Sequence, residues 1–255
     1  MKIAPDTIIR VASSEAVSLE LDVTADLGEV VLTPRNGEQL VIPLDKGAFD
    51  WPPLVAPNTV LVEWRASGST ETAFTNYAEV VSRHYFTLDQ LKAYGDGRDD
   101  FDELSDEVLW AARQAATDVF EEAAHRSFVE RYGRTLDFGG DRQLVLDHRD
   151  VREVLTPGYI QTSDSRLDRA PGCLDHPIWA EYLYGAESMP AEVSRAVLEL
   201  AAYTLRPTNR PIGATGESTD AGYVHFTTAG RDGWTAIPEV NAAIDMFGAG
   251  RRLAW

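Results

Sequence analysis

Residues 7–82 alternate hydrophobic and polar side chains with the two-residue period of β-strands. Strands are predicted at residues 7–11, 16–23, 29–34, 39–43, 60–66 and 73–81. Asn36-Gly37 lies between the third and fourth runs, and this pair tolerates the positive φ of a tight hairpin turn. We therefore expect a small antiparallel, β-sandwich-like domain over residues 1–85.

From residue 86 the hydrophobic spacing becomes that of helices. Ser105 is a suitable N-cap, and the apolar positions Val108, Ala112, Ala115, Val119 and Ala123 predict one buried face of a helix that ends near His125. Further helices are predicted at residues 87–91, 190–205 and 238–247. Residues 128–138 and 143–146 are predicted to form a hairpin, with strands at 151–155 and 178–184 and a turn-rich segment at 156–177.

Residues 208–233 are rich in glycine, threonine and proline, which favours a protruding arm with one extended run at 222–227. The expected fold class is α+β. The β-rich accessory domain, residues 1–85, is followed by a mainly helical domain with β-hairpins, residues 86–255. The second domain includes the arm and a C-terminal helix and tail at 237–255.

The charge of the chain is strongly acidic and unevenly distributed. With 23 basic and 41 acidic residues, the net charge is −18, which argues against a protein that holds nucleic acid through its phosphates. Residues 1–85 carry 6 basic and 12 acidic side chains, residues 86–205 carry 12 and 24, and residues 206–255 carry 5 and 5. The neutral last segment is therefore where we expect a protein partner to bind.

Motifs for metal, cofactor or catalytic chemistry are missing from the sequence. The five histidines are widely separated, and the single cysteine, Cys173, can form no internal disulfide. Phosphate-binding and dinucleotide-binding glycine motifs are absent. We expect no enzyme, no metal and no cofactor. The absence of a long apolar stretch or a signal-peptide pattern predicts a protein made in a cytoplasm, with no membrane partner.

Two other functions stay open at this stage. A hydrolase site could be assembled by the fold from Asp147, His148 and Asp175, although adjacent side chains on a strand point to opposite faces. A carbohydrate-binding protein could use the β-rich domain and exposed aromatic side chains. Its candidate residues are Trp51, Trp64 and Trp179, with Tyr182 and Tyr184 as further stacking rings. Core packing is the commoner reason for aromatic residues in a strand such as the one with Trp179, Tyr182 and Tyr184.

The order of elements after residue 105 is more specific than any single motif. A capped helix ends at Ala124-His125-Arg126-Ser127-Phe128, and the strand Tyr182-Leu183-Tyr184-Gly185 precedes a helix that starts at Met189-Pro190. The passage Gly230-Arg231 is followed by Ile237-Pro238-Glu239-Val240. Over residues 105–247 this order resembles the head-to-tail connector, or adaptor, proteins of long-tailed bacteriophages.

The resemblance implies a structural protein of the virion neck, assembled in the host cytoplasm. Copies of the chain would form a ring, of twelve subunits in this family. The ring would join the portal protein to the head-completion (stopper) or tail terminator protein and line the DNA channel. Genome DNA would pass through without specific binding. Residues 1–85 depart from the smaller adaptors, so the resemblance assigns them no role.

The family's portal-gripping C-terminal segment points to particular residues of this chain. The expected portal-binding residues are Ile237, Val240, Ile244, Phe247, Arg251, Arg252, Leu253 and Trp255. In the arm, Tyr223, Val224 and Phe226 are expected to contact a neighbouring subunit. An apolar anchor of this kind would have little use in a chain that works as a monomer.

Overall fold

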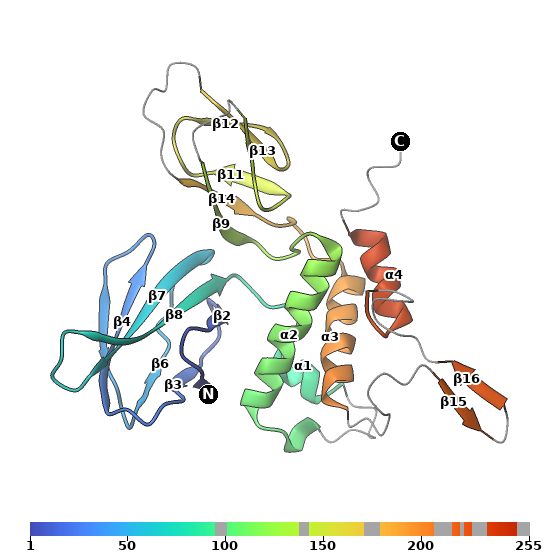
Figure 1. Ribbon diagram of the computed structural model, residues 1–255, viewed down its shortest axis with the longest axis horizontal. Coiled ribbons are helices and arrows are strands. Elements are labelled where there is room, and N and C mark those ends of the chain that lie inside the picture. The colour runs from blue at the N-terminus through green and yellow to red at the C-terminus, as the bar shows by residue number, and fades with distance from the viewer. Residues whose placement is uncertain are drawn as a thin grey trace. The chain divides into compact units, whose positions relative to one another are not determined.

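The structure is a computed structural model that describes residues 1–94, 101–137, 143–170, 179–206, 216–219, 222–225 and 234–248. Both helices and sheets are present, which confirms the α+β class (Figure 1). The internal contacts divide the chain into two units. The first contains Met1–His84 and Ser127–Ser188, and the second contains Tyr85–Arg126 and Met189–Trp255. This division groups residues 127–188 with the N-terminal strands, whereas the sequence pattern predicts a single boundary at residue 85.

The N-terminal part of the first unit contains two sheets. The five-stranded sheet has the order β2 (Ile8–Ala12), β8 (Thr72–Val81), β7 (Asn58–Ala66), β4 (Leu27–Pro34) and β5 (Leu40–Pro43). The three-stranded sheet has the order β1 (Lys2–Ile3), β3 (Ser18–Leu21) and β6 (Ala48–Asp50). The pairs β2–β8 and β1–β3 are parallel, so the expectation of a purely antiparallel domain is wrong. The long connection from β2 to β8 gives the chain the length that a parallel crossover needs.

Aromatic side chains fill the space between these two sheets. The ring of Phe49 on β6 meets the ring of Trp64 on β7 edge-on, with centroids 5.4 Å apart. Trp64 is fully buried, and its indole Nε1 donates to Asn76 Oδ1 at 3.0 Å. Trp51 is 7% exposed. Trp51 and Trp64 therefore belong to the core of the sandwich and offer no surface to a saccharide.

The predicted hairpin around Asn36-Gly37 is present, but its connection is longer than a two-residue turn, and neither of the two residues has a positive φ. Strands β4 and β5 pair from Glu29↔Pro43 to Leu32↔Leu40, which leaves residues 33–39 as the connection. On its other side β4 stays paired with β7 through Pro34, and the Arg35 amide donates to the Thr59 carbonyl at 2.9 Å. This pairing keeps the chain extended past the point where a two-residue turn would begin.

Residues 127–188 form two further three-stranded sheets. The first has the order β11 (Val151–Val154), β14 (Trp179–Tyr184) and β9 (Arg131–Leu136). The second has the order β10 (Gln143–Val145), β13 (Arg166–Arg169) and β12 (Tyr159–Ser163). The predicted hairpin between residues 128–138 and 143–146 is therefore wrong, because β9 pairs with β14 and β10 pairs with β13. The segment predicted to be turn-rich contains the β12–β13 hairpin, whose strands bury few side chains and so show little alternation.

The second unit contains the helices at the predicted places. They are α1 (Leu88–Lys92), α2 (Asp106–Ala124), α3 (Ala191–Leu205) and α4 (Pro238–Phe247), with a 3₁₀ turn, η1, at Phe101–Glu103. Ser105 caps α2 by accepting from the Val108 amide at 3.4 Å, and His125 ends it in the left-handed conformation at φ 52°. Within the predicted arm, β15 (Gly216–Thr219) and β16 (Gly222–His225) form an antiparallel hairpin.

The buried face of α2 differs from the predicted one. The core side of the helix carries Leu109, Ala112, Ala116, Phe120 and Ala123. Val108 and Val119 are each 44% exposed, and Ala115 is exposed too. The prediction was wrong at these three positions because α2 carries two apolar stripes, and the one with the larger side chains, Leu109 and Phe120, packs inward. Within the described residues, no helix has the length and hydropathy required to cross a membrane.

Candidate functional site

Beside its buried face, α2 carries an apolar stripe that is exposed in the described part of the chain. Val108, Ala111, Ala115 and Val119 are all exposed and recur at intervals of three and four residues. At the helical repeat this spacing places them in one line along the helix. We call these four residues the α2 stripe. Aligned apolar residues on an exposed helix face are typical of a surface that packs against another protein.

Other exposed apolar side chains of the second unit lie outside α2. Tyr203 on α3 is 43% exposed, Met246 on α4 is 70% exposed, and Trp234 just before α4 is 56% exposed. The indole of Trp234 meets the ring of His125 edge-on at 5.9 Å. These side chains give the unit apolar surface on elements other than the one that carries the α2 stripe.

Side-chain hydrogen bonds hold α4 firmly in its unit. The Thr235 amide donates to Asn241 Oδ1 at 2.8 Å, and the Thr235 hydroxyl donates to the Ile237 carbonyl at 3.2 Å. At the other end of α4, Arg126 Nη1 donates to the Phe247 carbonyl at 3.1 Å. The Thr235 bonds join α4 to the residues just before it, and the Arg126 bond gives a carbonyl at its C-terminal end a partner.

The predicted portal-binding residues fall into two groups. Ile237, Val240 and Ile244 are buried inside the second unit, at 6%, 0% and 3% exposure, and Phe247 is half-buried. Their side chains attach α4 to its own unit. Arg251, Arg252, Leu253 and Trp255, together with Phe226 of the arm, lie outside the described residues, and for Tyr223 and Val224 the backbone strand β16 alone is described.

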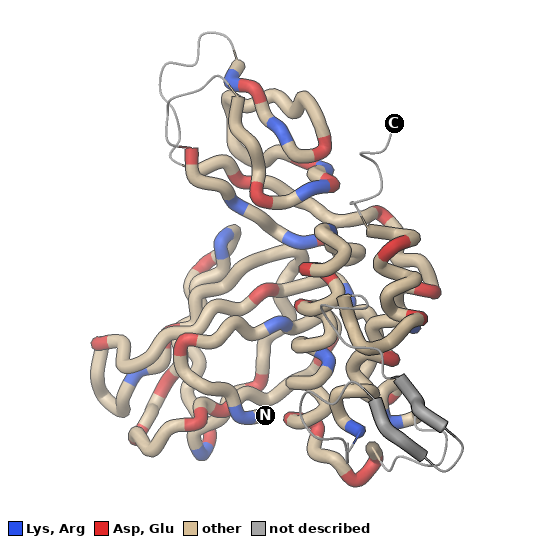
Figure 2. The backbone as a smooth tube through the Cα atoms, turned by 45° about the vertical axis from the view of Figure 1, so that its right-hand side comes forward, with Lys and Arg blue, Asp and Glu red and all other residues tan. Residues whose placement is uncertain are grey.

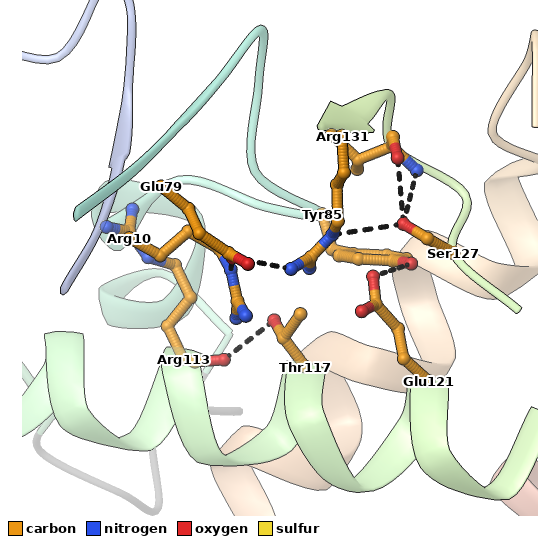
Figure 3. Close-up of polar contacts among 9 residues, drawn as sticks. Arg10, Glu79, Tyr85, Arg113, Thr117, Glu121, Ser127 and Arg131 are labelled. Atoms are coloured by element: carbon orange, nitrogen blue, oxygen red, sulfur yellow. Dashed lines mark hydrogen bonds and ion pairs between the residues drawn. The ribbon is translucent and has the colours of Figure 1, made fainter. Parts of the chain in front are cut away.

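The exposed charged residues of α2 and α4 are acidic, whereas α3 carries one exposed acid, Glu192, and one exposed base, Arg195. Figure 2 shows where the charged residues lie along these helices. The exposed carboxylates on them are Asp106, Glu107, Asp118, Glu122, Glu192, Glu239 and Asp245. Arg113 on α2 is 3% exposed, and the Tyr85 hydroxyl donates to Glu121 at 2.7 Å (Figure 3). The α2 stripe is therefore an apolar line in an otherwise negative helical surface.

A buried ion-pair cluster connects the N-terminal sandwich to β9 in the first unit (Figure 3). Glu79 Oε2 on β8 lies 2.9 Å from Arg10 Nε on β2 and 2.7 Å from Arg131 Nη1 on β9. Arg131 Nε also donates to Ser127 Oγ at 3.2 Å. Burial on its own would raise the pKa of Glu79, but the charges of Arg131 and Arg10 outweigh it and lower that pKa below its ordinary value. The carboxylate is therefore ionised in the folded protein.

This cluster is not among the predicted sites, although two charged residues in apolar strands of the sequence indicate it. Arg10 interrupts the apolar run of β2, and Glu79 interrupts the apolar end of β8. A charged residue in a buried strand needs an opposite charge, because burial of an unpaired charge is costly. The sequence does not show that the second arginine comes from β9, far along the chain.

The two described hydrolase candidates, Asp147 and His148, bond to different partners and not to each other. His148 Nδ1 lies 2.8 Å from the Tyr182 hydroxyl, and its ring stacks on Tyr184 at 3.9 Å. Asp147 Oδ2 instead accepts from the Thr135 hydroxyl at 2.9 Å. Burial lowers the pKa of His148. Asp175 lies outside the described residues, and among the described residues no group of histidine, cysteine or acidic side chains is placed to hold a metal ion.

The aromatic residues proposed for carbohydrate stacking separate into core and surface. Tyr182 and Tyr184 are 0% and 7% exposed and pack in the core of the β9–β14 region. Trp179 is 40% exposed, with the Arg134 guanidinium 4.5 Å from the centre of its ring. Trp179 is thus the one of the three candidate tryptophans that meets solvent.

No family model matches the chain, and no curated protein matches it. Among solved structures, a chain from the neck of an empty GTA particle is 16% identical with a TM-score of 0.39, over 51% of this chain and 83% of that chain. A chain from the virion of a native gene transfer agent (GTA) particle is 17% identical with a TM-score of 0.43, over 67% of this chain and 93% of that chain. Likeness at this level does not identify the family or the function of the chain.

Proposed function

We propose that this chain is a structural protein of the neck of a phage-like particle and that copies of it assemble into a ring. The observation that carries the proposal is the α2 stripe, an exposed apolar line on an acidic helical surface. The stripe lies in the part of the chain, residues 105–247, whose order of elements resembles the connector proteins. A neighbouring copy of the chain covers the stripe in the ring.

A ring requires two different surfaces on each subunit, because each copy meets one neighbour on each side. The helical unit has both. The α2 stripe supplies the first, and the exposed apolar residues Tyr203, Met246 and Trp234 supply candidates for the second. Within the unit, α3 packs against both α2 and α4, and α2 also contacts α4 (Figure 1), so the two candidate surfaces lie on different helices of one bundle. This arrangement suits head-to-tail packing around a closed ring.

The acidic helix surfaces suit a channel that DNA passes through. A wall that bound phosphates through lysine and arginine would hold the genome, whereas exposed carboxylates repel it. Glu107, Asp118 and Glu122 are exposed on α2 beside the stripe. We assign acidic helix faces of this kind to the channel side of the ring.

The C-terminal tail is assigned to the portal protein and the arm to the neighbouring subunit. Arg251, Arg252, Leu253 and Trp255 combine positive charge with apolar side chains in the least acidic segment of the chain. Tyr223, Val224 and Phe226 are the corresponding residues of the arm. The role assigned to the buried residues is to fix α4, from which the tail continues. These residues are Ile237, Val240 and Ile244.

Mass photometry of the purified chain, with and without portal rings of the same particle, tests the proposal. We expect masses that correspond to a ring of this chain, alone or bound to the portal ring. Electron microscopy of the same sample should show ring-shaped particles. A chain that stays monomeric at all concentrations and never binds a portal ring would overturn the proposal.

Removing residues 249–255 is expected to weaken portal binding at least about tenfold without unfolding the second unit. Truncation at this point keeps Gly248, whose amide caps α4 by donating to the Ile244 carbonyl at 2.7 Å. Portal binding is measured by pull-down and mass photometry, and folding by thermal unfolding. A variant whose tail is replaced by glycine and serine of equal length separates side-chain contacts from chain length. Equal portal binding by all three proteins would exclude the tail from the interface.

A further inference from the structure

The first unit contains a cleft of about 440 Å³ that the proposed ring does not use. The N-terminal sheet contributes residues of β4, β7 and β8 to its wall, and β9, β14 and His148 form the rest. Clefts that bind small molecules are typically several hundred Å³ in volume, with rings on their walls and a few fixed polar groups. This cleft has the volume and both kinds of group.

The polar groups of the cleft are held in place before any ligand binds. Arg35 Nη2 forms an ion pair with Glu181 Oε2, and the Arg35 guanidinium lies 4.3 Å from the centre of the Tyr132 ring. The Tyr132 hydroxyl donates to the other carboxylate oxygen, Glu181 Oε1, at 2.6 Å. Each of the three side chains is therefore fixed by the other two. Such planar, fixed groups suit recognition of adjacent hydroxyls, with Arg35 as donor and Glu181 as acceptor.

Rings line the remaining wall of the cleft. Tyr77 on β8 is 57% exposed, and Tyr132 is half-buried. Deeper in the cleft the ring of His148 stacks on Tyr184. Flat aromatic faces of this kind contact the C–H faces of a pyranose ring, while the hydroxyls of the sugar reach the polar groups beside them.

The row of side chains continues along β9 and β14 beyond the cleft. Arg134 lines the cleft and pairs in register with Glu181, and its guanidinium lies over the exposed ring of Trp179. Arg134 is itself exposed, so its remaining donors face solvent. The side chains of the cleft are therefore continued along β14 by one exposed aromatic ring, Trp179.

We propose that this cleft binds an oligosaccharide that contains pyranose rings. Tyr77 and Tyr132 are the stacking residues, Arg35, Glu181 and Arg134 bond to the hydroxyls, and Trp179 contacts a second sugar unit. The site is independent of the ring interface, because its residues belong to the first unit whereas the α2 stripe belongs to the second. A neck protein with this site would bind glycan with its first unit.

The cleft binds without cleaving. Hydrolysis of a glycosidic bond requires one carboxyl group that keeps its proton near neutral pH, together with a second that is ionised. The two carboxylates of the cleft both have a pKa below the ordinary value, Glu181 because Arg35 and Tyr132 donate to it and Glu79 because the charges of Arg131 and Arg10 outweigh its burial. Neither is a suitable general acid, so the bound saccharide should remain intact.

An array of neutral and uronic-acid-containing oligosaccharides, probed with the full-length chain, tests the site. Any array signal is then measured in solution with the free oligosaccharide by calorimetry and by quenching of tryptophan fluorescence. We expect binding at concentrations of about 1 mM or lower. Because Tyr77 and Arg134 are exposed, Tyr77→Ala and Arg134→Ala should keep the fold and each weaken binding about tenfold. Ile160→Ala, which truncates an exposed apolar side chain of the first unit outside the cleft, is the matched control and should bind as the unmodified chain does.

Three outcomes would overturn the saccharide site. The first is an array without signal above background. The second is a signal that Tyr77→Ala and Arg134→Ala leave unchanged while thermal unfolding shows both variants folded. The third is a signal that Ile160→Ala removes, which would place the binding surface outside the cleft. None of the three affects the mass-photometry test of ring assembly, so the two proposals can fail separately.

Discussion

Replacing Val119 with glutamate is expected to abolish ring assembly and leave a folded chain. Val119 is 44% exposed at one end of the α2 stripe, so the isolated subunit loses little buried area. Glutamate is a better helix former than valine, and the helix should therefore persist. In the ring, by contrast, the new carboxylate would be taken out of water without a partner, which is costly. Mass photometry with portal rings should show at least about a hundredfold weaker assembly.

Val55→Glu is the matched control for this variant. It introduces the same side chain at a valine that is 84% exposed and lies outside the helical unit, so rings should form as before. Val108→Glu, at the other end of the stripe, should repeat the defect of Val119→Glu. Normal rings from both α2 variants would remove the stripe from the interface, and loss of rings in the Val55 control would show that added charge alone is responsible.

The positions of the helices could be predicted because their signals are local. The side chain of Ser105 and the fixed backbone of Pro190 and Pro238 mark helix starts. In the structure a helix begins directly after Ser105, directly after Pro190, and at Pro238 itself. The face that α2 buries is not a local property. Two apolar stripes compete for the core, and the packing of α3 and α4 decides in favour of the one with Leu109 and Phe120.

Strand pairing and the polar clusters of the first unit could not be predicted from the sequence either, because they also depend on contacts between distant segments. The strands Arg131–Leu136 and Trp179–Tyr184 are evident as strands, but nothing near either one indicates that they pair with each other. Arg35, Tyr132 and Glu181 occupy ordinary polar positions of three separate strand regions, and only the fold brings them to one cleft. The outward direction of Trp179, unlike that of Tyr182 and Tyr184, likewise follows from the side of the sheet that the core occupies.

Glu79→Gln is expected to lower the free energy of unfolding of the first unit by about 3 kcal/mol. The substitution removes the negative charge and leaves Arg10 and Arg131, at 8% and 4% exposure, without their shared counter-ion. Urea unfolding followed by the fluorescence of buried Trp64 measures the change. Glu20→Gln is the matched control, since the pair Lys2–Glu20 is exposed and 3.7 Å long, and the expected loss there is about 0.5 kcal/mol or less.

The same variant should change how stability depends on pH. Because folding lowers the pKa of Glu79 from its ordinary value of 4.5, the ion pairs stabilise the protein fully above that value and lose their contribution as pH falls through the lower folded pKa. As the pH falls from neutral, the free energy of unfolding of the unmodified chain should therefore decrease more than that of Glu79→Gln. At acid pH the two free energies should converge. Charging of the half-buried His148 also destabilises the folded chain in acid, and since the negative charge of Glu79 acts to raise the pKa of His148, this contribution is larger in Glu79→Gln than in the unmodified chain. Parallel pH profiles for the two proteins would mean that the Glu79 carboxylate is not what joins the N-terminal sandwich to β9.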